Sequence, residues 1–293
     1  MDRFAGFAFA LLLTASTWVS AAPSSPVVLT GADRRQAVSL DGDWATIVDP
    51  YFSGLFSFHQ QERKDGYFLN RKAQPNDTFP TEYNFAKAPK LKVPGDWNTQ
   101  RESLYFYEGP IWYERDFSWT LQKDHHVFLH IGAANYHSWF WVNGVKVCEH
   151  EGGYTAFNCE ITTALKDGSN FVVAAVDNTR HEDGVPTLQT DWWNYGGLTR
   201  SVSLIDLPSS WVDQYDVHLS RTAESTLEGW VHLADAKPGS TVTVRVPELQ
   251  AEVAAKTSED GRAQFTLAIK NPCSGRLKIQ SSIRCRSLLR RTA

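Results

Sequence analysis

This chain of 293 residues lacks several features that point to common functions. Its four cysteines include no Cys-x-x-Cys pair, so the sequence indicates no zinc site. The formal net charge is −4 and no basic stripe occurs, which argues against a nucleic-acid partner. No apolar run after the N-terminal segment is long enough to cross a bilayer, so we expect no membrane partner.

Motifs of familiar catalytic sites are also missing. No Gly-x-Ser-x-Gly elbow occurs, no glycine-rich phosphate loop precedes a helix, and the nine histidines are scattered. The densest acidic pair is Glu182-Asp183, but adjacent side chains in a loop diverge. The sequence therefore assigns no catalytic residue, no metal ligand and no cofactor.

The first 21 residues have the pattern of a secretory signal peptide. Arg3 supplies a small positive region, Phe7 to Leu13 is apolar, and Val19-Ser20-Ala21 offers small residues for cleavage before Ala22. We therefore predict a signal peptide over residues 1–21 and a secreted or periplasmic mature protein.

Helical periodicity is nearly absent, and short apolar runs separated by turns predict an all-β protein. In a first unit, residues 22–207, the pattern indicates a hairpin over Trp139–Val147 that turns at Asn143-Gly144, and a central strand at Phe171–Val176. A second unit, residues 208–272, shows four strands, fewer than the seven of an immunoglobulin-like sandwich. These strands are expected at Trp211–Leu219, Leu227–Leu233, Thr241–Val246 and Gln264–Ile269.

Aromatic residues, in contrast, are abundant, with 11 Trp, 10 Tyr and 16 Phe. Between Asp191 and Arg200, one carboxylate is followed by three aromatics and a Gly-Gly pair. Aromatic faces stack on the C–H faces of sugars, and a carboxylate accepts hydrogen bonds from sugar hydroxyls. The stretch is thus either a candidate carbohydrate site or a tight turn with buried aromatics.

Two cysteines flank another Gly-Gly turn. Cys148 and Cys159 are placed to face each other on neighbouring strands, and an oxidising compartment permits a disulfide between them. Two buried free thiols are the other interpretation.

Six short motifs follow one another in a specific order. They are Leu40–Trp44, Val93–Asn98, Trp112–Phe117, Trp141–Gly144, His150–Tyr154 and Asn194–Arg200. Together they resemble the N-terminal half of glycoside hydrolase family 2, in particular its β-glucuronidases and β-galactosidases. The resemblance implies a jelly-roll β-sandwich that binds sugar, then an immunoglobulin-like β-sandwich, then a catalytic (β/α)₈ barrel.

The resemblance also implies substrate-binding residues. Asp191 occupies the position at which a carboxylate of the family's jelly roll contacts the terminal sugar. It would accept hydrogen bonds from a hydroxyl at the non-reducing end. Asp96 stands where some members have a sugar-contacting polar residue, and Trp192 and Asn194 belong to the same motif as Asp191. Of Trp192 and its neighbour Trp193, we expect one to be buried, because alternate residues of an extended segment face opposite sides.

The chain departs from the family after Leu207, because a barrel needs about 250 residues and far fewer follow. The family's Asn-Glu acid/base signature does not occur. We therefore expect a sugar-binding fragment of a secreted retaining exo-β-glycosidase that is itself inactive, with a terminal β-linked sugar as its partner. The alternatives are a stand-alone carbohydrate-binding module or lectin, and a structural adhesion-type sandwich. We also expect self-association through the face that would pack on a barrel.

The last segment, residues 273–293, loses the β pattern and becomes basic. One interpretation is a disordered tail. The other is an out-of-frame reading, because permitted codons for Cys273–Ile283 in a shifted frame encode Trp-Ser-Pro-Glu-Asp-Pro-Lys-Leu-Tyr, which resembles the continuation of the family's second domain.

Overall fold

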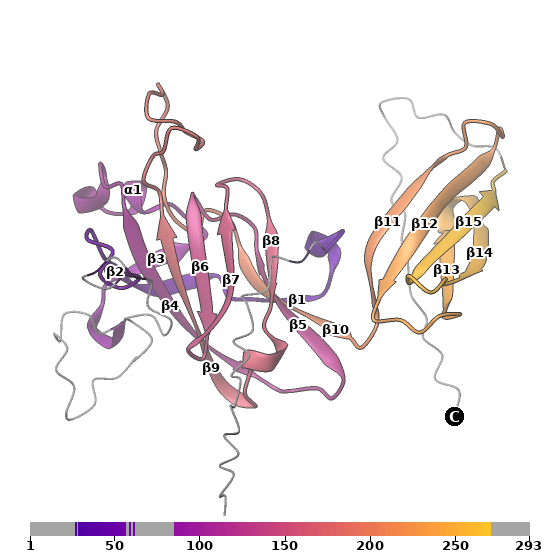
Figure 1. The fold of residues 1–293 in the computed structure, drawn as a ribbon, viewed down its shortest axis with the longest axis horizontal. Coiled ribbons are helices and arrows are strands. Elements are labelled where there is room, and N and C mark those ends of the chain that lie inside the picture. Colours follow the sequence, from indigo (N-terminus) through magenta and orange to yellow (C-terminus); the bar gives the residue numbers. More distant parts are fainter. Residues whose placement is uncertain (1–26, 28, 57–58, 60, 62–84, 271–293) are drawn as a thin grey trace, which may run out of the picture.

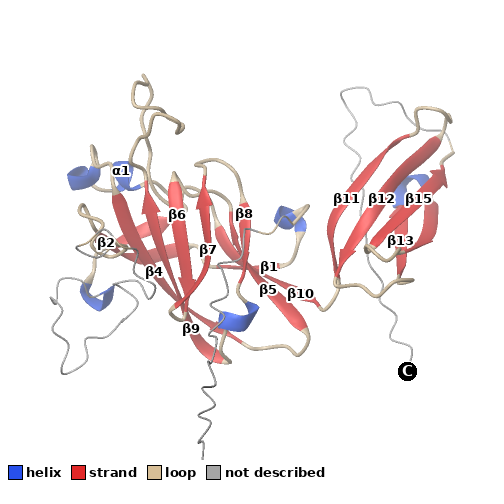
Figure 2. Cartoon of the chain, in the orientation of Figure 1, coloured by secondary structure: helices blue, strands red, loops and turns tan. Residues whose placement is uncertain are grey.

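The computed structural model describes residues 27, 29–56, 59, 61 and 85–270, which form two β units in tandem (Figure 1). Strands dominate both units (Figure 2), so the expected all-β class is confirmed. The expected signal peptide 1–21 and the tail 273–293 lie outside the described residues. Helical segments are short: α1 (Trp97–Gln100), η1 (Ala32–Arg34), η3 (Phe85–Lys87), η4 (Glu102–Leu104), η5 (Thr162–Ala164) and η6 (Pro247–Leu249).

The first unit is a sandwich of two antiparallel sheets. One sheet has the strand order β3-β2-β4-β9-β6-β7 and the other has the order β1-β10-β5-β8. The strands of the six-stranded sheet are β2 (Gly42–Val48), β3 (Lys90–Val93), β4 (Pro110–Trp119), β6 (His137–Val142), β7 (Val145–Glu151) and β9 (Gly168–Asp177). Those of the four-stranded sheet are β1 (Ala37–Ser39), β5 (His125–Ile131), β8 (Phe157–Glu160) and β10 (Val202–Pro208).

Local sequence signals explain the two elements that were predicted most sharply. The β6–β7 hairpin turns at Asn143 and Gly144, whose φ angles are 50° and 87°. This left-handed conformation is the one that Asn-Gly adopts in a type I′ turn. The apolar strand β9 is paired along both edges, with β4 and with β6. Both predictions are confirmed.

The main core lies between the two sheets. It includes Trp44 and Ile111 of the six-stranded sheet and Leu129 and Leu204 of the four-stranded sheet. A second cluster covers the outer face of the six-stranded sheet, where the indoles of Trp112 and Trp141 stack with centroids 5.3 Å apart. Trp97, Trp112 and Trp141 are fully buried.

The second unit has its own small core between two sheets. The sequence indicated four of its strands but not β14, because alanines at three of its six positions give a weak strand pattern. The described residues contain five strands, so an immunoglobulin-like sandwich of about seven is not confirmed. Its sheets are β11-β12-β15 and β13-β14, with β11 (Trp211–Leu219), β12 (Thr226–Ala234), β13 (Thr241–Val246), β14 (Ala251–Lys256) and β15 (Arg262–Ala268).

A small apolar cluster joins the two units. The ring of Trp211, the first residue of β11, packs against Phe128 on the outer face of the four-stranded sheet, with centroids 5.5 Å apart. The backbone N–H of Thr30 donates to the carbonyl of Asp213 at 2.8 Å. The second unit therefore contacts the four-stranded sheet.

Candidate functional site

Three loops meet at one end of the first unit. They are the 94–109 segment with α1, the 178–200 segment between β9 and β10, and the turn at 132–136 (Figure 1). Backbone hydrogen bonds join them: the N–H of Gly95 donates to Leu198 at 2.9 Å, that of Trp97 to Gly196 at 3.0 Å, and that of Asn135 to Gly197 at 2.9 Å. Two of the six sequence motifs, Val93–Asn98 and Asn194–Arg200, thus lie side by side.

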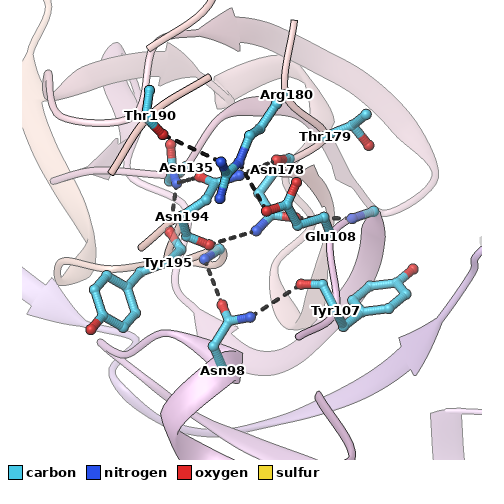
Figure 3. A network of polar contacts seen from close by, with 12 residues as sticks. Asn98, Tyr107, Glu108, Asn135, Asn178, Thr179, Arg180, Thr190, Asn194 and Tyr195 are labelled. Atoms are coloured by element: carbon cyan, nitrogen blue, oxygen red, sulfur yellow. Dashed lines mark hydrogen bonds and ion pairs between the residues drawn. The ribbon is translucent and has the colours of Figure 1, made fainter. Parts of the chain in front are cut away.

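Asn98 joins two of these loops at one edge of a network of polar contacts, the framework (Figure 3). Its buried amide nitrogen donates to the carbonyls of Leu104, Tyr105 and Tyr107 at 3.0–3.2 Å. Its amide oxygen accepts from the N–H of Gly196 at 3.0 Å. One side chain therefore holds the 94–109 loop in shape and fixes the 178–200 loop against it.

Two further buried asparagines make reciprocal bonds. Asn178 donates to the carbonyl of Asn194 at 3.0 Å, and the Asn194 side chain donates to the carbonyl of Asn178. Asn135 donates to the Asn194 side-chain oxygen at 3.1 Å and to the Tyr195 carbonyl. Buried amides that are hydrogen-bonded in this way fix a loop, because breaking them leaves unpaired polar groups.

The paired glycines are required by close packing. A Cβ at Gly196 would overlap the indole of Trp97, and Gly197 has φ +130°, which L side chains rarely adopt. The Gly-Gly pair therefore allows the 178–200 loop to lie directly on α1.

Arg180 clamps the outer part of the same loop. Its Nε forms an ion pair with Glu108 Oε1 at 2.9 Å, and its Nη1 donates to the Thr190 hydroxyl at 3.3 Å (Figure 3). Thr190 precedes Asp191, so the clamp also fixes the start of the candidate motif.

Asp191 and Trp192 project from this framework into solvent. Both are exposed, with Trp192 at 53% of its surface, and both line an open pocket together with residues 184–187, Gln189 and Thr190. Trp193 is half-buried, so of the two tryptophans the less exposed one is Trp193. The exposed pair is available to a ligand, because neither side chain is needed for the framework.

Next to the pocket lies a group of aromatic side chains that we call the aromatic patch: Tyr105, Phe106, Trp193 and Tyr195. Trp193 is 4.8 Å from Tyr105, 5.5 Å from Phe106 and 6.4 Å from Tyr195, centroid to centroid. Phe106 is 81% exposed. Contiguous exposed aromatics mark contact surfaces.

Two residues expected to bind substrate have structural roles. Asn194 is 3% exposed and its amide is engaged by Asn178 and Asn135, so the structure corrects its assignment to direct sugar contact. The carboxylate of Asp96 caps α1, accepting from the backbone N–H of Thr99 at 2.7 Å and from its hydroxyl at 2.9 Å. Each oxygen of Asp96 thus accepts one capping hydrogen bond, and its contact with sugar stays a prediction.

Sequence reasoning missed Asn98, Asn135, Asn178 and Arg180. Asn98 is the last residue of the Val93–Asn98 motif, but no neighbouring residue in the sequence indicates that its amide would bridge two loops. Tyr113 is buried beside Gly197. Burial, and to a lesser extent the charge of Asp96, raises the pKa of Tyr113, so this phenol stays neutral.

Away from the loops, a disulfide joins Cys148 of β7 to Cys159 of β8, with Cα atoms 5.7 Å apart. Of the two interpretations of this cysteine pair, the structure contains the bridge. It links strands of the two different sheets.

Within the described residues, no group of three or more His, Cys, Asp or Glu side chains is arranged to hold a metal ion. The search of the same residues for a long apolar helix that would cross a membrane finds none.

Comparison with known proteins identifies the family to which the chain belongs. Residues 39–208 match the model of "Glycosyl hydrolases family 2, sugar binding domain". The chain therefore belongs to glycosyl hydrolase family 2, and this match covers the first sandwich with its loop end.

Curated relatives of the chain include β-glucuronidases. The enzyme of Rattus norvegicus is 30% identical over 212 residues, which are 62% of this chain and 30% of the relative. That of Chlorocebus aethiops is 32% identical over 64% of this chain and 31% of the relative. The chain thus spans about a third of the length of these relatives, and corresponds to a sugar-binding N-terminal part of β-glucuronidase-like enzymes.

Solved structures agree on the fold. The β-glucuronidase of Ruminococcus gnavus matches with a TM-score of 0.61 and 24% identity, over 84% of this chain and 39% of that one. The Bifidobacterium dentium β-glucuronidase, solved in complex with coumarin-3-O-glucuronide, matches with a TM-score of 0.61 and 20% identity, over 81% of this chain and 42% of that one.

Proposed function

We propose that this chain is the part of a secreted retaining exo-β-glycosidase that binds the terminal sugar. The enzyme would be of the β-glucuronidase or β-galactosidase type. In this proposal Asp191 accepts hydrogen bonds from hydroxyls at the non-reducing end, and Trp192 offers its indole face to the ring. The observation that carries it is the exposure of these two side chains at a pocket whose framework is buried and hydrogen-bonded. A preorganised site binds with little ordering cost.

The bond-breaking carboxylates are assigned to a catalytic barrel and not to this chain. Retaining hydrolysis needs two carboxyl groups about 5–5.5 Å apart, and the family's Asn-Glu signature does not occur in this sequence. We expect the purified chain to release no p-nitrophenol from p-nitrophenyl β-D-glucuronide above a buffer blank. Turnover that copurifies with the chain through successive columns would refute this assignment.

The proposal places the protein outside the cytoplasm, secreted or periplasmic. The signal-peptide pattern of residues 1–21 supports this, and so does the disulfide between Cys148 and Cys159, because such bonds persist in oxidising compartments.

The aromatic patch is the surface through which we expect self-association of the isolated chain. Its exposed Phe106 and Tyr105 would be covered by a catalytic barrel or by a second copy. Light scattering should show concentration-dependent association that Phe106→Ser reduces. A monomer at all concentrations would contradict this.

Binding measured with the full chain tests the role of Asp191. Saturation-transfer NMR with methyl β-D-glucuronide and methyl β-D-galactoside should detect one of them, and Asp191→Ala should weaken it about tenfold or more, since a charge-assisted hydrogen bond contributes roughly 1.5–3 kcal/mol. Asp183→Asn is the matched control, because Asp183 is exposed on the same loop but does not line the pocket. Equal binding by Asp191→Ala and the control would remove Asp191 from the site.

The same titration bears on the alternative, a stand-alone carbohydrate-binding module. The observation that favours this alternative is that Asn98, Asn135 and Asn178 hold the loops of the site by hydrogen bonds within the first unit. A micromolar Kd of the isolated chain for a free glycan would support the stand-alone module. A millimolar Kd is what we expect of a sugar-binding domain that lacks its catalytic barrel.

A further inference from the structure

A second open pocket lies at the other end of the first sandwich. It is lined by residues from four strands and the β4–β5 turn, among them Val38, Trp119, Gln122, His125, Leu204 and Asp206. Strand β4 separates the two ends: Pro110 begins it beside the loops of the candidate site, and Trp119 ends it here. Ten residues of strand span roughly 30 Å, so the two pockets are separate.

The register of β5 and β10 places the pocket where the apolar core between the two sheets ends and polar side chains begin. Along β10, Val202 and Leu204 face the other sheet and belong to the main core, and Asp206 is the next residue on the same face. Along β5, Val127 and Leu129 are core residues, and His125 precedes them on that face. On both β10 and β5, the residues that face the other sheet therefore change from apolar to polar at the end of the sandwich, where they reach solvent.

The polar side chains of the pocket are fixed by one another. Asp206 accepts from His125 Nδ1 at 2.8 Å through one oxygen and from Gln122 Nε2 at 3.2 Å through the other. The carboxylate side chain is 22% exposed and the imidazole 30%. The group is thus held in place yet reachable by a ligand, and each carboxylate oxygen keeps a further lone pair for an incoming hydroxyl.

The opposite wall is apolar. Trp119 packs its indole against the core, while Val38 on the edge strand β1 is 52% exposed. Among the described residues the Trp119 indole N–H has no acceptor. Of the remaining lining residues, Ala37 is apolar, and Gln36, Ser118 and Thr120 carry neutral hydrogen-bonding groups.

We propose that this pocket is a second carbohydrate site, which takes a neutral pyranose unit of a glycan chain. An indole and an aliphatic wall suit the C–H face of a sugar ring, and a fixed carboxylate, imidazole and amide suit its hydroxyls. The described residues that line the pocket include no Lys or Arg and one carboxylate, so the site selects against sugars that carry a carboxylate or sulfate. A site of this kind holds the protein on a polysaccharide while the distant pocket contacts a chain end.

Saturation-transfer NMR on the full chain tests this with cellohexaose, xylohexaose and mannohexaose, each at about 5 mM, because weak sugar sites have Kd values near the millimolar range. At least one should bind, and a galacturonic acid hexasaccharide should bind at least several-fold more weakly. Trp119→Ala should raise Kd about tenfold and Asp206→Asn several-fold, whereas Trp119→Phe, which keeps an aromatic face, should retain most binding.

A blocking experiment keeps the proposal testable if Trp119→Ala does not fold. Gln36 is exposed at the pocket, so Gln36→Cys labelled with a bulky maleimide should close the pocket without altering the core. The wild-type chain treated with the same reagent is the control, since it carries the other cysteines. Trp192→Ala should leave this binding unchanged, which separates the second site from the proposed function. Failure of all three neutral hexasaccharides to bind folded protein, or binding that survives the block, overturns the proposal.

Discussion

Replacing Asn98 by Ala should destabilise the first unit and loosen both loops of the candidate site. The side chain donates two protons among three loop carbonyls and accepts the N–H of Gly196. The variant therefore loses about three hydrogen bonds, each worth roughly 1 kcal/mol net, and leaves buried partners unpaired. We expect the free energy of unfolding to fall by about 3 kcal/mol.

The isosteric variant Asn98→Asp separates hydrogen bonding from packing. It keeps the volume and the acceptor for Gly196, but it directs a carboxylate oxygen at the carbonyls of Leu104, Tyr105 and Tyr107. It should be at least as destabilising at neutral pH and should recover partly in acid, where a protonated carboxyl donates one hydrogen bond.

Urea denaturation followed by tryptophan fluorescence measures both variants. Gln189→Ala is the control, an exposed amide at the same end of the unit, and should change stability by less than about 0.5 kcal/mol. If Asn98→Ala costs no more than Gln189→Ala, the amide network does not hold the loops and the account of the framework is wrong.

Two further predictions concern other parts of the first unit. Replacing both Cys148 and Cys159 by Ala should lower the stability by about 3 kcal/mol, since the bridge closes a short loop with a sequence separation of 11; a double variant as stable as the oxidised parent would contradict this. Burial lowers the pKa of His150 below the ordinary histidine value of 6.5, so the unfolded chain binds that proton more readily and stability is lost as the pH falls through this range. Unfolding curves between about pH 7.5 and 5.5 should show a steeper loss for the parent than for His150→Gln, and parallel losses would exclude His150 as the source.

Short-range patterns in the sequence determined much of the fold. The Asn143-Gly144 turn and the apolar strand β9 were both predicted, because the turn depends on a local φ requirement and the strand on the residue types of one segment. The types of the residues from Asp191 to Gly197 were likewise enough to propose a candidate carbohydrate site there. Strand β14 was missed since its alanines carry no such pattern.

The tertiary structure alone decided which polar residues support the site and which face solvent. Asn98 and Gly196 are 98 residues apart in sequence, and Gly109 and Asn178 are 69 apart, yet the pairing of β4 with β9 brings these segments into hydrogen-bonding contact. An asparagine has the same local propensity whether its amide meets a carbonyl of a distant loop or water. The role of Asn194 in the framework and the second pocket at Asp206 therefore became visible only once the strands were paired, because each depends on partners that chain order does not place together.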